Sequence, residues 1–333
     1  MTKAMTIIER IQTVGIRRTG TPARGFRYSG PRGGGVSRVD RARIEALRIP
    51  PAWNDVAIHP SPVASVQAIG KDRAGRWQYL YHETQTARRE RRKHDRLVRF
   101  IAALPKMRRA VSRDLRRRGL AREKVLAGIL RILATCFLRP GSKVYADENG
   151  SYGIATLRKR HVTVRGEVVR FDFNGKSGKR QLRELRDKSI AALVRQLLLY
   201  PGEVFKFRSE NGKIVDVRSE HINAYIREIM GETFSAKDLR TWAGTLLCAY
   251  ALARRASDPA ASQTARKRSV REAIREVAGH LGNTPAVCRT SYIFPSVIRS
   301  YEKGRVIGHV AELVDGSPRA IERSERALLE LLR

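Results

Sequence analysis

The residue of this chain with the clearest chemical potential is Tyr292, in the segment GHLGNTPAVCRTSYIFP at residues 279–295. Thr284 followed by Pro285 predicts a helix start, because threonine caps free backbone N–H groups and proline suits the first helical position. Tyr292 then falls about two turns into that helix, which Pro295 ends or kinks. A phenol acts as a nucleophile when nearby positive charge favours its phenolate, although a tyrosine in a short helix is more often a buried aromatic.

Three basic residues lie close to the ends of other predicted elements. Arg139 follows a mostly apolar helix predicted over residues 120–138, where it could serve only the last carbonyls and the helix dipole. Lys176 lies in the turn NGKSGKR, where a solvated lysine is the simplest interpretation. Arg240 lies just past the first turn of a helix predicted from Ser235, whose start SAKD resembles a capping box. Taken singly, these residues do not establish a site.

The composition favours a polyanionic partner. Lys and Arg total 67 against 32 Asp and Glu, which leaves a formal charge of +35 on 333 residues. Basic side chains set against phosphates release condensed counterions, so nucleic acid is the expected partner and a small metabolite is disfavoured as substrate. The hydrophobic content of 42% is that of a globular chain, and the length suits two domains.

Other features indicate a location inside the cell. The sequence has no apolar run long enough to span a bilayer, and its start, MTKAMTIIERIQ, lacks a signal-peptide core. Cys136, Cys248 and Cys288 lie apart in apolar contexts, which is typical of core thiols in a reducing compartment. We therefore expect a cytoplasmic, nucleoid-associated protein without disulfides or metal ligands.

Residues 1–85 are predicted to form a small β-rich lobe. Residues 1–35 are rich in Gly, Arg and Pro and are expected to be an extended, flexible basic arm. A short helix follows, capped by Asp40 and stopped by Pro50. Strands are expected at residues 55–60, 63–70 and 76–82, the last two joined by a loop that contains glycine.

The last of these strands combines an aromatic row with polar and basic neighbours. Trp77, Tyr79 and Tyr81 alternate along it and share one face, where sheet core is at least as good an interpretation as contact with nucleic acid. A glutamine can bond an adenine edge, and basic residues can bind phosphate. The candidate DNA-contacting residues of this lobe are Lys71, Arg73, Arg76, Gln78, Tyr79 and Tyr81.

Residues 86–333 are predicted to form a second, mainly helical domain with a small antiparallel sheet. Basic amphipathic helices are expected over 86–105 and, after Pro105, over 106–119, and their nearly uniform sign favours a surface that faces phosphate. The strands are assigned to GIATL, HVTVRG and EVVRFDF at 153–157, 161–166 and 167–173, the last turning over at NGKSGKR. Further helices are expected at 189–200, 219–230, 235–255, 269–282 and 319–333, with a hairpin at 203–217.

Four segments together resemble type IB DNA topoisomerases of the compact bacterial and poxvirus-like kind. They are FLRPGSKVY, FDFNGKSGKR, SAKDLRTWAG and LGNTPAVCRTSY, and RWQYLYH extends the resemblance into the amino-terminal part. The resemblance implies an α+β protein in which a β-rich lobe and a helical catalytic lobe form a C-shaped clamp on double-stranded DNA. It also implies a monomer that relaxes supercoiled DNA by transient single-strand cleavage, strand rotation and religation, without ATP, cofactor or metal.

The resemblance assigns a role to each candidate residue. Tyr292 matches the nucleophile, which becomes joined to the 3′-phosphate. Arg139 and Arg240 match the arginines that bind the non-bridging oxygens, where negative charge builds up in the transition state. Lys176 matches the general acid that protonates the departing 5′-oxygen. Lys237 matches a lysine that assists near the scissile phosphate.

One position departs from the family pattern. Asn283, nine residues before Tyr292, lies where eukaryotic and poxvirus members carry histidine. Asparagine can donate to a non-bridging oxygen but supplies no charge, so we expect a weaker hold on the phosphate. His280 is close by but has the wrong spacing, and we do not assign it. Tyr145, at the end of FLRPGSKVY, joins the candidate DNA contacts.

Two other functions are compatible with parts of this pattern. A tyrosine recombinase shares the nucleophile, two arginines and a lysine, but such enzymes typically carry histidine three residues before the second arginine, where this chain has Lys237. A non-catalytic basic protein that coats or bends DNA would explain the charge but not the four segments.

Overall fold

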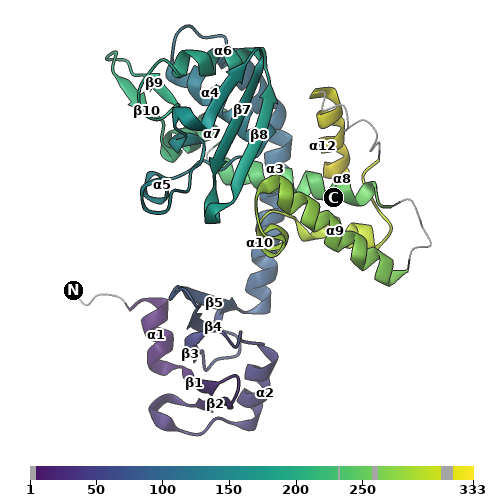
Figure 1. The fold of residues 1–333 in the computed structure, drawn as a ribbon. Coiled ribbons are helices and arrows are strands. Elements are labelled where there is room, and N and C mark those ends of the chain that lie inside the picture. The colour runs from purple at the N-terminus through teal and green to yellow at the C-terminus, as the bar shows by residue number, and fades with distance from the viewer. Residues whose placement is uncertain (1–4, 232, 257–261, 309–317) are drawn as a thin grey trace. The chain divides into compact units, whose positions relative to one another are not determined.

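The computed structural model describes residues 5–231, 233–256, 262–308 and 318–333. The chain divides into two compact units, Met1–His94 and Asp95–Arg333 (Figure 1). The first is built on an antiparallel sheet, and the second is mainly helical with small antiparallel sheets, which confirms the expected α+β class. Among the residues described, no helix is both long and apolar enough to cross a membrane.

The first unit is a five-stranded antiparallel sheet with a helix on each face, in the order β2-β1-β3-β4-β5. Ile11 of α1 packs with Ile69 on one face, and Ile44 of α2 packs with Ile58 on the other. The three strands expected from the sequence are confirmed. The elements are α1 (Ile7–Val14), β1 (Ile16–Thr21), β2 (Gly25–Ser29), a 3-10 turn (Pro31–Gly33), α2 (Arg38–Ala46), β3 (Asn54–Ile58), β4 (Val66–Lys71) and β5 (Trp77–Tyr81).

The flexible arm expected at residues 1–35 is wrong for the part that the structure describes. Thr6 and Glu9 form a capping box that starts α1. The strands β1 and β2 form a hairpin, and Ile16 of β1 pairs with Ile58 of β3. Two of these glycines, Gly20 and Gly25, have φ 97° and 78° in the hairpin, a conformation that glycine adopts without strain.

The helix that follows the sheet is longer than expected. α3 runs without interruption from Glu83 to Asp114, so the predicted break at Pro105 is wrong. Proline inside a helix costs about 3 kcal/mol through a lost hydrogen bond and a clash. Here Leu104 and Met107, on either side of it, are both buried in the core of the second unit, and this burial offsets the cost.

The second unit is organised around α8, which packs against α4, α7, α9, α11 and α12, while α4 and α6 pack on the three-stranded sheet β6-β7-β8 (Figure 1). Its helices are α4 (Arg122–Cys136), α5 (Lys143–Asn149), α6 (Lys188–Leu197), α7 (Ser219–Met230), α8 (Ala236–Ala253), α9 (Gln263–Leu281), α10 (Pro285–Ser291), α11 (Pro295–Glu302) and α12 (Pro318–Leu332). Its strands are β6 (Val162–Arg165), β7 (Val168–Asn174), β8 (Arg180–Arg186), β9 (Lys206–Arg208) and β10 (Ile214–Asp216).

Several boundaries differ from the sequence prediction because local patterns are ambiguous at element ends. GIATL forms a 3-10 turn, and the third strand of the sheet is β8, beyond the turn. α9 begins at Gln263, six residues before the expected start at 269. The hydroxyl of Ser37, not Asp40, caps α2. Pro295 starts α11 and does not end the helix before it.

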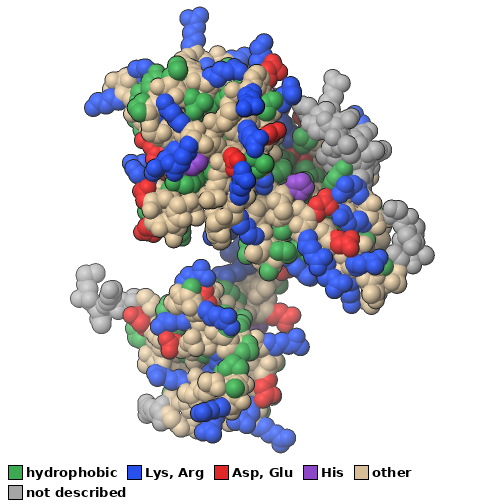
Figure 2. All heavy atoms as spheres, viewed as in Figure 1, with side chains coloured by type: hydrophobic (Ala, Val, Ile, Leu, Met, Phe, Trp, Pro, Cys, Tyr) green, Lys and Arg blue, Asp and Glu red, His purple; other side chains and the backbone are tan. Residues whose placement is uncertain are grey.

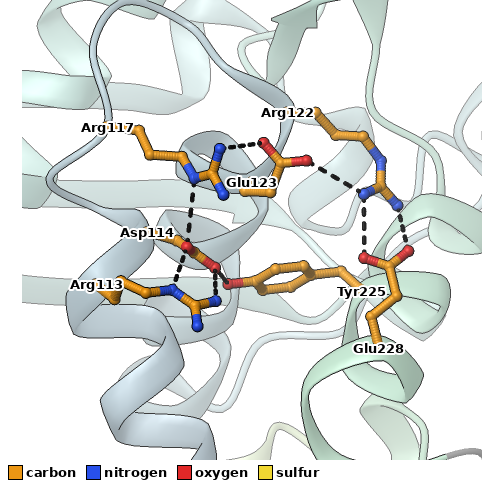
Figure 3. A network of polar contacts seen from close by, with 7 residues as sticks. All are labelled: Arg113, Asp114, Arg117, Arg122, Glu123, Tyr225 and Glu228. Atoms are coloured by element: carbon orange, nitrogen blue, oxygen red, sulfur yellow. Dashed lines mark hydrogen bonds and ion pairs between the residues drawn. The ribbon is translucent and has the colours of Figure 1, made fainter.

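A polar network that joins α3, α4 and α7 is centred on the buried side chains of Asp114 and Tyr225 (Figure 3). The carboxylate of Asp114, which is 1% exposed, accepts hydrogen bonds from the Tyr225 hydroxyl at 2.8 Å and from the Arg113 guanidinium at 2.9 and 3.0 Å. Burial alone would raise the pKa of Asp114, but these hydrogen bonds and the charge of Arg113 outweigh it, and the pKa is lowered. Asp114 is therefore ionised and stabilising at neutral pH.

We expect Tyr225→Phe to lower the free energy of unfolding by about 1.5–3 kcal/mol, because a buried carboxylate loses one charge-assisted hydrogen bond. Urea denaturation at pH 7 measures this. An acid whose pKa is lowered by folding stabilises the protein above its unfolded value and loses that contribution as the pH falls through the folded value. The difference in the free energy of unfolding between wild type and Tyr225→Phe should therefore become smaller below about pH 4. A difference that does not change with pH would contradict an ionised Asp114.

Candidate active site

Six candidate residues of the second unit line one cavity of about 750 Å³, whereas Asn283 lies outside its lining. Its walls come from the end of α4, from α5, from the turn between β7 and β8, and from the starts of α7 and α8 and the end of α10. Of the residues singled out from the sequence, those in its lining are Arg139, Tyr145, Lys176, Lys237, Arg240 and Tyr292.

Tyr292 lies at the carboxyl end of α10 and is held there by α8. It is the C-cap residue of α10, with φ −130° and ψ −15°, and so it does not lie inside a longer helix as expected. The hydroxyl of Thr245 accepts from the N–H of Phe294 at 3.2 Å. Its oxygen lies 3.3 Å from the Tyr292 carbonyl and 2.7 Å from the Thr241 carbonyl, and these two acceptors share its one proton. Gly244 lies directly against Tyr292, since a Cβ added there would be 2.6 Å from the Tyr292 carbonyl oxygen. The half-buried tyrosine thus has a defined position.

Arg240 is the most deeply placed charge in the cavity wall, with 3% of its surface exposed. One of its terminal nitrogens donates to the carbonyl of Leu281 at 2.8 Å, and the other donates to the carbonyl of Phe137. The guanidinium carbon lies 4.9 Å from the centre of the Tyr292 ring. Burial lowers the pKa of Arg240, as does the neighbouring charge of Arg139, but an arginine remains charged at neutral pH.

The positive charge around Tyr292 changes its acidity. Burial alone would raise the pKa of its phenol, but Arg240, then Arg139 and Lys237, act in the opposite direction. The net effect is a lowered pKa. The phenolate, which is the nucleophilic form, is therefore more accessible at neutral pH than in an ordinary tyrosine.

Asn283 lies beside Arg139 and is 8% exposed. Its side-chain oxygen accepts a hydrogen bond from Arg139, which also donates to the carbonyl of Gly282 at 3.4 Å. The side-chain nitrogen of Asn283 is buried and has no hydrogen-bond partner among the residues that the structure describes. An unpaired buried donor costs about 1–3 kcal/mol, so this nitrogen and the equally unpaired Nε of Arg240 are groups in the site that would gain from an acceptor.

Lys176 and Lys237 are exposed and contribute their side chains to the cavity from opposite elements. Lys176 begins the tight turn between β7 and β8, in which Ser177 has φ 63°. Lys237 lies in the first turn of α8. The start of that helix is held by Arg96 of α3, whose guanidinium donates to both carboxylate oxygens of Asp238 at 2.6 Å. Tyr145, 60% exposed on α5, also lines the cavity.

The remaining candidates belong to the first unit and are mostly engaged with neighbours. Lys71 forms an ion pair with Asp55 at 2.8 Å and lies 5.0 Å from the centre of the Trp77 ring. Arg76 and Gln78 both donate to the Asp72 carboxylate. Arg73 is exposed.

The aromatic row of β5 is half-buried. Trp77, Tyr79 and Tyr81 pack against the cluster that contains Ile11 of α1, as the sheet-core interpretation predicts. The Tyr79 and Tyr81 rings stack with centroids 6.1 Å apart, and the guanidinium of Arg89 lies 3.6 Å from the Tyr81 ring centre. These packing contacts cover part of each ring, and the remaining exposed part is what other molecules could contact.

Sequence reasoning missed the residues that hold the site together. The sequence pattern places Gly244 and Thr245 only within a buried helix, although a glycine inside an apolar helix is a signal of close approach. Lys179, the second lysine of NGKSGKR, donates to the carbonyl of Asn283 at 3.0 Å. His280 is exposed, its carbonyl accepts from Arg183 at 2.7 Å, and it does not line the cavity. No group of three or more His, Cys, Asp or Glu that could hold a metal occurs in the described part of the chain.

Two family models match the chain. The model described as Eukaryotic DNA topoisomerase I, catalytic core, matches residues 82–307, which include the whole cavity. The model described as Bacterial DNA topoisomerase IB, N-terminal domain, matches residues 25–72. The two matches follow one another along the chain without overlap.

Curated relatives agree with these models. A DNA topoisomerase 1B of Acanthamoeba polyphaga mimivirus is 35% identical over 274 residues, which are 80% of this chain and 81% of the relative. A DNA topoisomerase 1B of Vaccinia virus is 21% identical over 137 residues, which are 40% of this chain and 44% of the relative.

The contact between α8 and Tyr292 predicts an unusual response to a helix-favouring substitution. Glycine to alanine inside a helix normally stabilises by about 1 kcal/mol. Gly244→Ala should instead destabilise by about 1–3 kcal/mol, because the new Cβ meets backbone atoms of Tyr292. Gly279→Ala in α9, where an added Cβ meets no atom of the described residues within 4 Å, is the matched control and should stabilise. Thermal unfolding shows whether each variant is more or less stable than the wild type. Stabilisation by both substitutions would contradict the close contact between Gly244 and Tyr292.

Proposed function

The chain belongs to the type IB DNA topoisomerases, which relax supercoiled DNA by cleaving and rejoining a strand, and from that premise we propose that Tyr292 is the nucleophile of this reaction. The observation that carries the proposal is the placement of Arg240 against the Tyr292 ring, with Arg139 in the wall of the same cavity. This arrangement lowers the pKa of the tyrosine and presents two permanent charges where a phosphate would bind. In this scheme the phenolate oxygen attacks phosphorus and becomes joined to the 3′-phosphate as the 5′-oxygen departs.

Arg139 and Arg240 are the groups that stabilise the transition state in this scheme. Negative charge builds up on the non-bridging oxygens, and guanidinium groups fixed in advance in a partly buried site stabilise it without reorganisation. The buried, unpaired nitrogen of Asn283 supports its proposed role as a neutral donor to one of these oxygens. Because Arg139 already donates to the Asn283 side chain, the two residues act as one unit.

Lys176 and Lys237 are the exposed cations of the cavity, and we assign them different tasks. Lys176, on the turn between β7 and β8, is the general acid that protonates the departing 5′-oxygen, a leaving group too basic to depart unaided. Lys237 lies one helical turn before Arg240 on α8 and lowers the pKa of Tyr292, so it assists by charge.

The bound substrate is duplex DNA, and the protein acts on it as a monomer. Lys and Arg side chains are spread over the visible face of each unit (Figure 2), in line with the formal charge of +35. Such a surface attracts the phosphate backbone without reading its sequence. Tyr145 and the residues of β4 and β5 are the proposed additional contacts; in the first unit these are Lys71, Arg73, Arg76, Gln78, Tyr79 and Tyr81. Chromosomal DNA would place the enzyme at the nucleoid.

We expect Tyr292→Phe to bind DNA with nearly unchanged affinity but to lose relaxation completely, because the ring is kept and the nucleophilic oxygen is removed. Plasmid relaxation in EDTA without ATP, run beside the wild type, measures the activity. Denaturant quenching should trap a protein–DNA adduct for the wild type and none for the variant. Relaxation of the plasmid by Tyr292→Phe would exclude Tyr292 as the nucleophile. Products with exchanged strands would identify a recombinase.

We expect Lys176→Ala to slow single-turnover cleavage by a factor on the order of 10²–10⁴, the range of a lost general acid. A substrate with sulfur in place of the bridging 5′-oxygen releases a thiolate, whose conjugate acid has a pKa of about 8.5 and which departs without a proton. Cleavage of this substrate should be nearly the same for Lys176→Ala and wild type. Lys237→Ala is the control and should show no such rescue. If sulfur fails to restore Lys176→Ala, the general-acid role is wrong.

A further inference from the structure

Four consecutive backbone carbonyls at the end of α9 each accept a hydrogen bond from a different cation. The carbonyl of His280 accepts from Arg183 at 2.7 Å, and that of Leu281 accepts from Arg240 at 2.8 Å. The carbonyl of Gly282 accepts from Arg139 at 3.4 Å, and that of Asn283 accepts from Lys179 at 3.0 Å. Two of these cations are the proposed phosphate ligands, and the other two have no role in the chemistry described above.

This end of α9 is a suitable place to gather positive charge. The last carbonyls of a helix lack intrahelical partners and carry the negative end of its dipole. Neutral carbonyls hold cations in position without cancelling their charge, as a carboxylate would. Burial lowers the pKa of Arg183, as it does that of Arg240, so both guanidinium groups depend on these acceptors for the hydrogen bonds they lose with water.

Lys179 comes from the turn that carries Lys176. Lys176 begins the 3-10 turn Lys176–Gly178, and the carbonyl of Lys179 closes the turn by accepting the N–H of Gly175 at 2.9 Å. The ammonium group of Lys179 then reaches the carbonyl of Asn283, 104 residues further along the chain. This short turn therefore places Lys176 in the cavity wall, while Lys179 donates a hydrogen bond to Asn283, the residue beside Arg139.

A second contact fixes the same pair of segments. Gly282 has φ 62°, and a Cβ added to it would lie 2.6 Å from the side-chain amide of Gln181. Gln181 is 6% exposed, and its amide nitrogen donates to the carbonyl of Lys179 at 3.2 Å. The turn and the end of α9 are thus packed as well as hydrogen-bonded.

We propose that Lys179 is a positioning residue for strand cleavage: it locks the Lys176 turn onto Asn283, so that the general acid and the phosphate-binding pair Arg139 and Asn283 face the same phosphate. This inference rests on the proposed function. Lys179 touches neither the leaving oxygen nor the nucleophile in this scheme, and its effect passes through the carbonyl of Asn283. A lysine that merely satisfies a helix end would affect stability and not the rate of the chemical step.

The test is a double-variant experiment on single-turnover cleavage of duplex DNA. Lys179→Met should slow cleavage by about 10- to 100-fold, the order expected for a small misplacement of catalytic groups. Lys179→Arg, which keeps a charged donor, should recover most of the rate. Lys213→Met, which removes a charge from the exposed hairpin between β9 and β10, controls for weaker DNA attraction and should cleave normally at saturating enzyme.

The decisive comparison uses the background Lys176→Ala, because Asn283→Ala would keep the backbone carbonyl that Lys179 contacts. If Lys179 acts by positioning Lys176, Lys179→Met should cost much less there than in the wild type, whereas an equal cost in both backgrounds would overturn the proposal. The 5′-sulfur substrate bypasses the general acid but not the phosphate-binding pair, so it should restore Lys179→Met only in part, and no restoration at all would also overturn the proposal. Failure of Lys176→Ala to respond to sulfur would instead count against the proposed function alone.

Discussion

The buried guanidinium of Arg240 is the interaction on which the rest of the site depends. It donates to the carbonyl of Phe137 at the end of α4 and to that of Leu281 at the end of α9, so one cation joins two helix carboxyl ends. Partial negative charge at both ends stabilises the cation in a place where water cannot. The left-handed Phe137 at one end leads directly to Arg139, and the other end leads to Asn283. The same group lies against the ring of Tyr292.

Bringing several cations together in a partly buried site costs free energy, because like charges repel and lose water. The cations next to Tyr292 donate to backbone carbonyls, which leave their positive charge available to a phosphate. Outside the lining of the cavity the acceptors are carboxylates: Asp238 accepts from Arg96 at the start of α8, and the buried Asp114 accepts from Arg113. A carboxylate cancels the charge of the cation that it pairs with, so these pairs hold helices in place but offer no free charge to a phosphate. The carbonyl acceptors keep the cations of the site both fixed in position and charged.

In the first unit, too, carboxylates engage some of the side chains proposed to contact DNA. Lys71, Arg76 and Gln78 are engaged by Asp55 or Asp72, so a phosphate would have to compete with a carboxylate for them. Exposed ion pairs of this kind are worth about 1 kcal/mol or less, and the competition is therefore weak. Contacts there suit adjustable, sequence-tolerant binding, whereas the site in the second unit is built in advance.

The sequence by itself determined the residue types and the local motifs. The caps at Ser235 and Thr284, the hairpin turn at Lys176 and the four family segments depend on neighbours within a few residues, and they were sufficient to name every candidate that lines the cavity. The tertiary structure alone decided how these residues are held. The hydroxyl of Thr245 reaches the carbonyl of Tyr292, 47 residues away, and Lys179 reaches Asn283 across 104. It also decided that α3 continues through Pro105 and that the glycine-rich amino terminus forms a hairpin, because long-range burial and pairing override the local preference in both places.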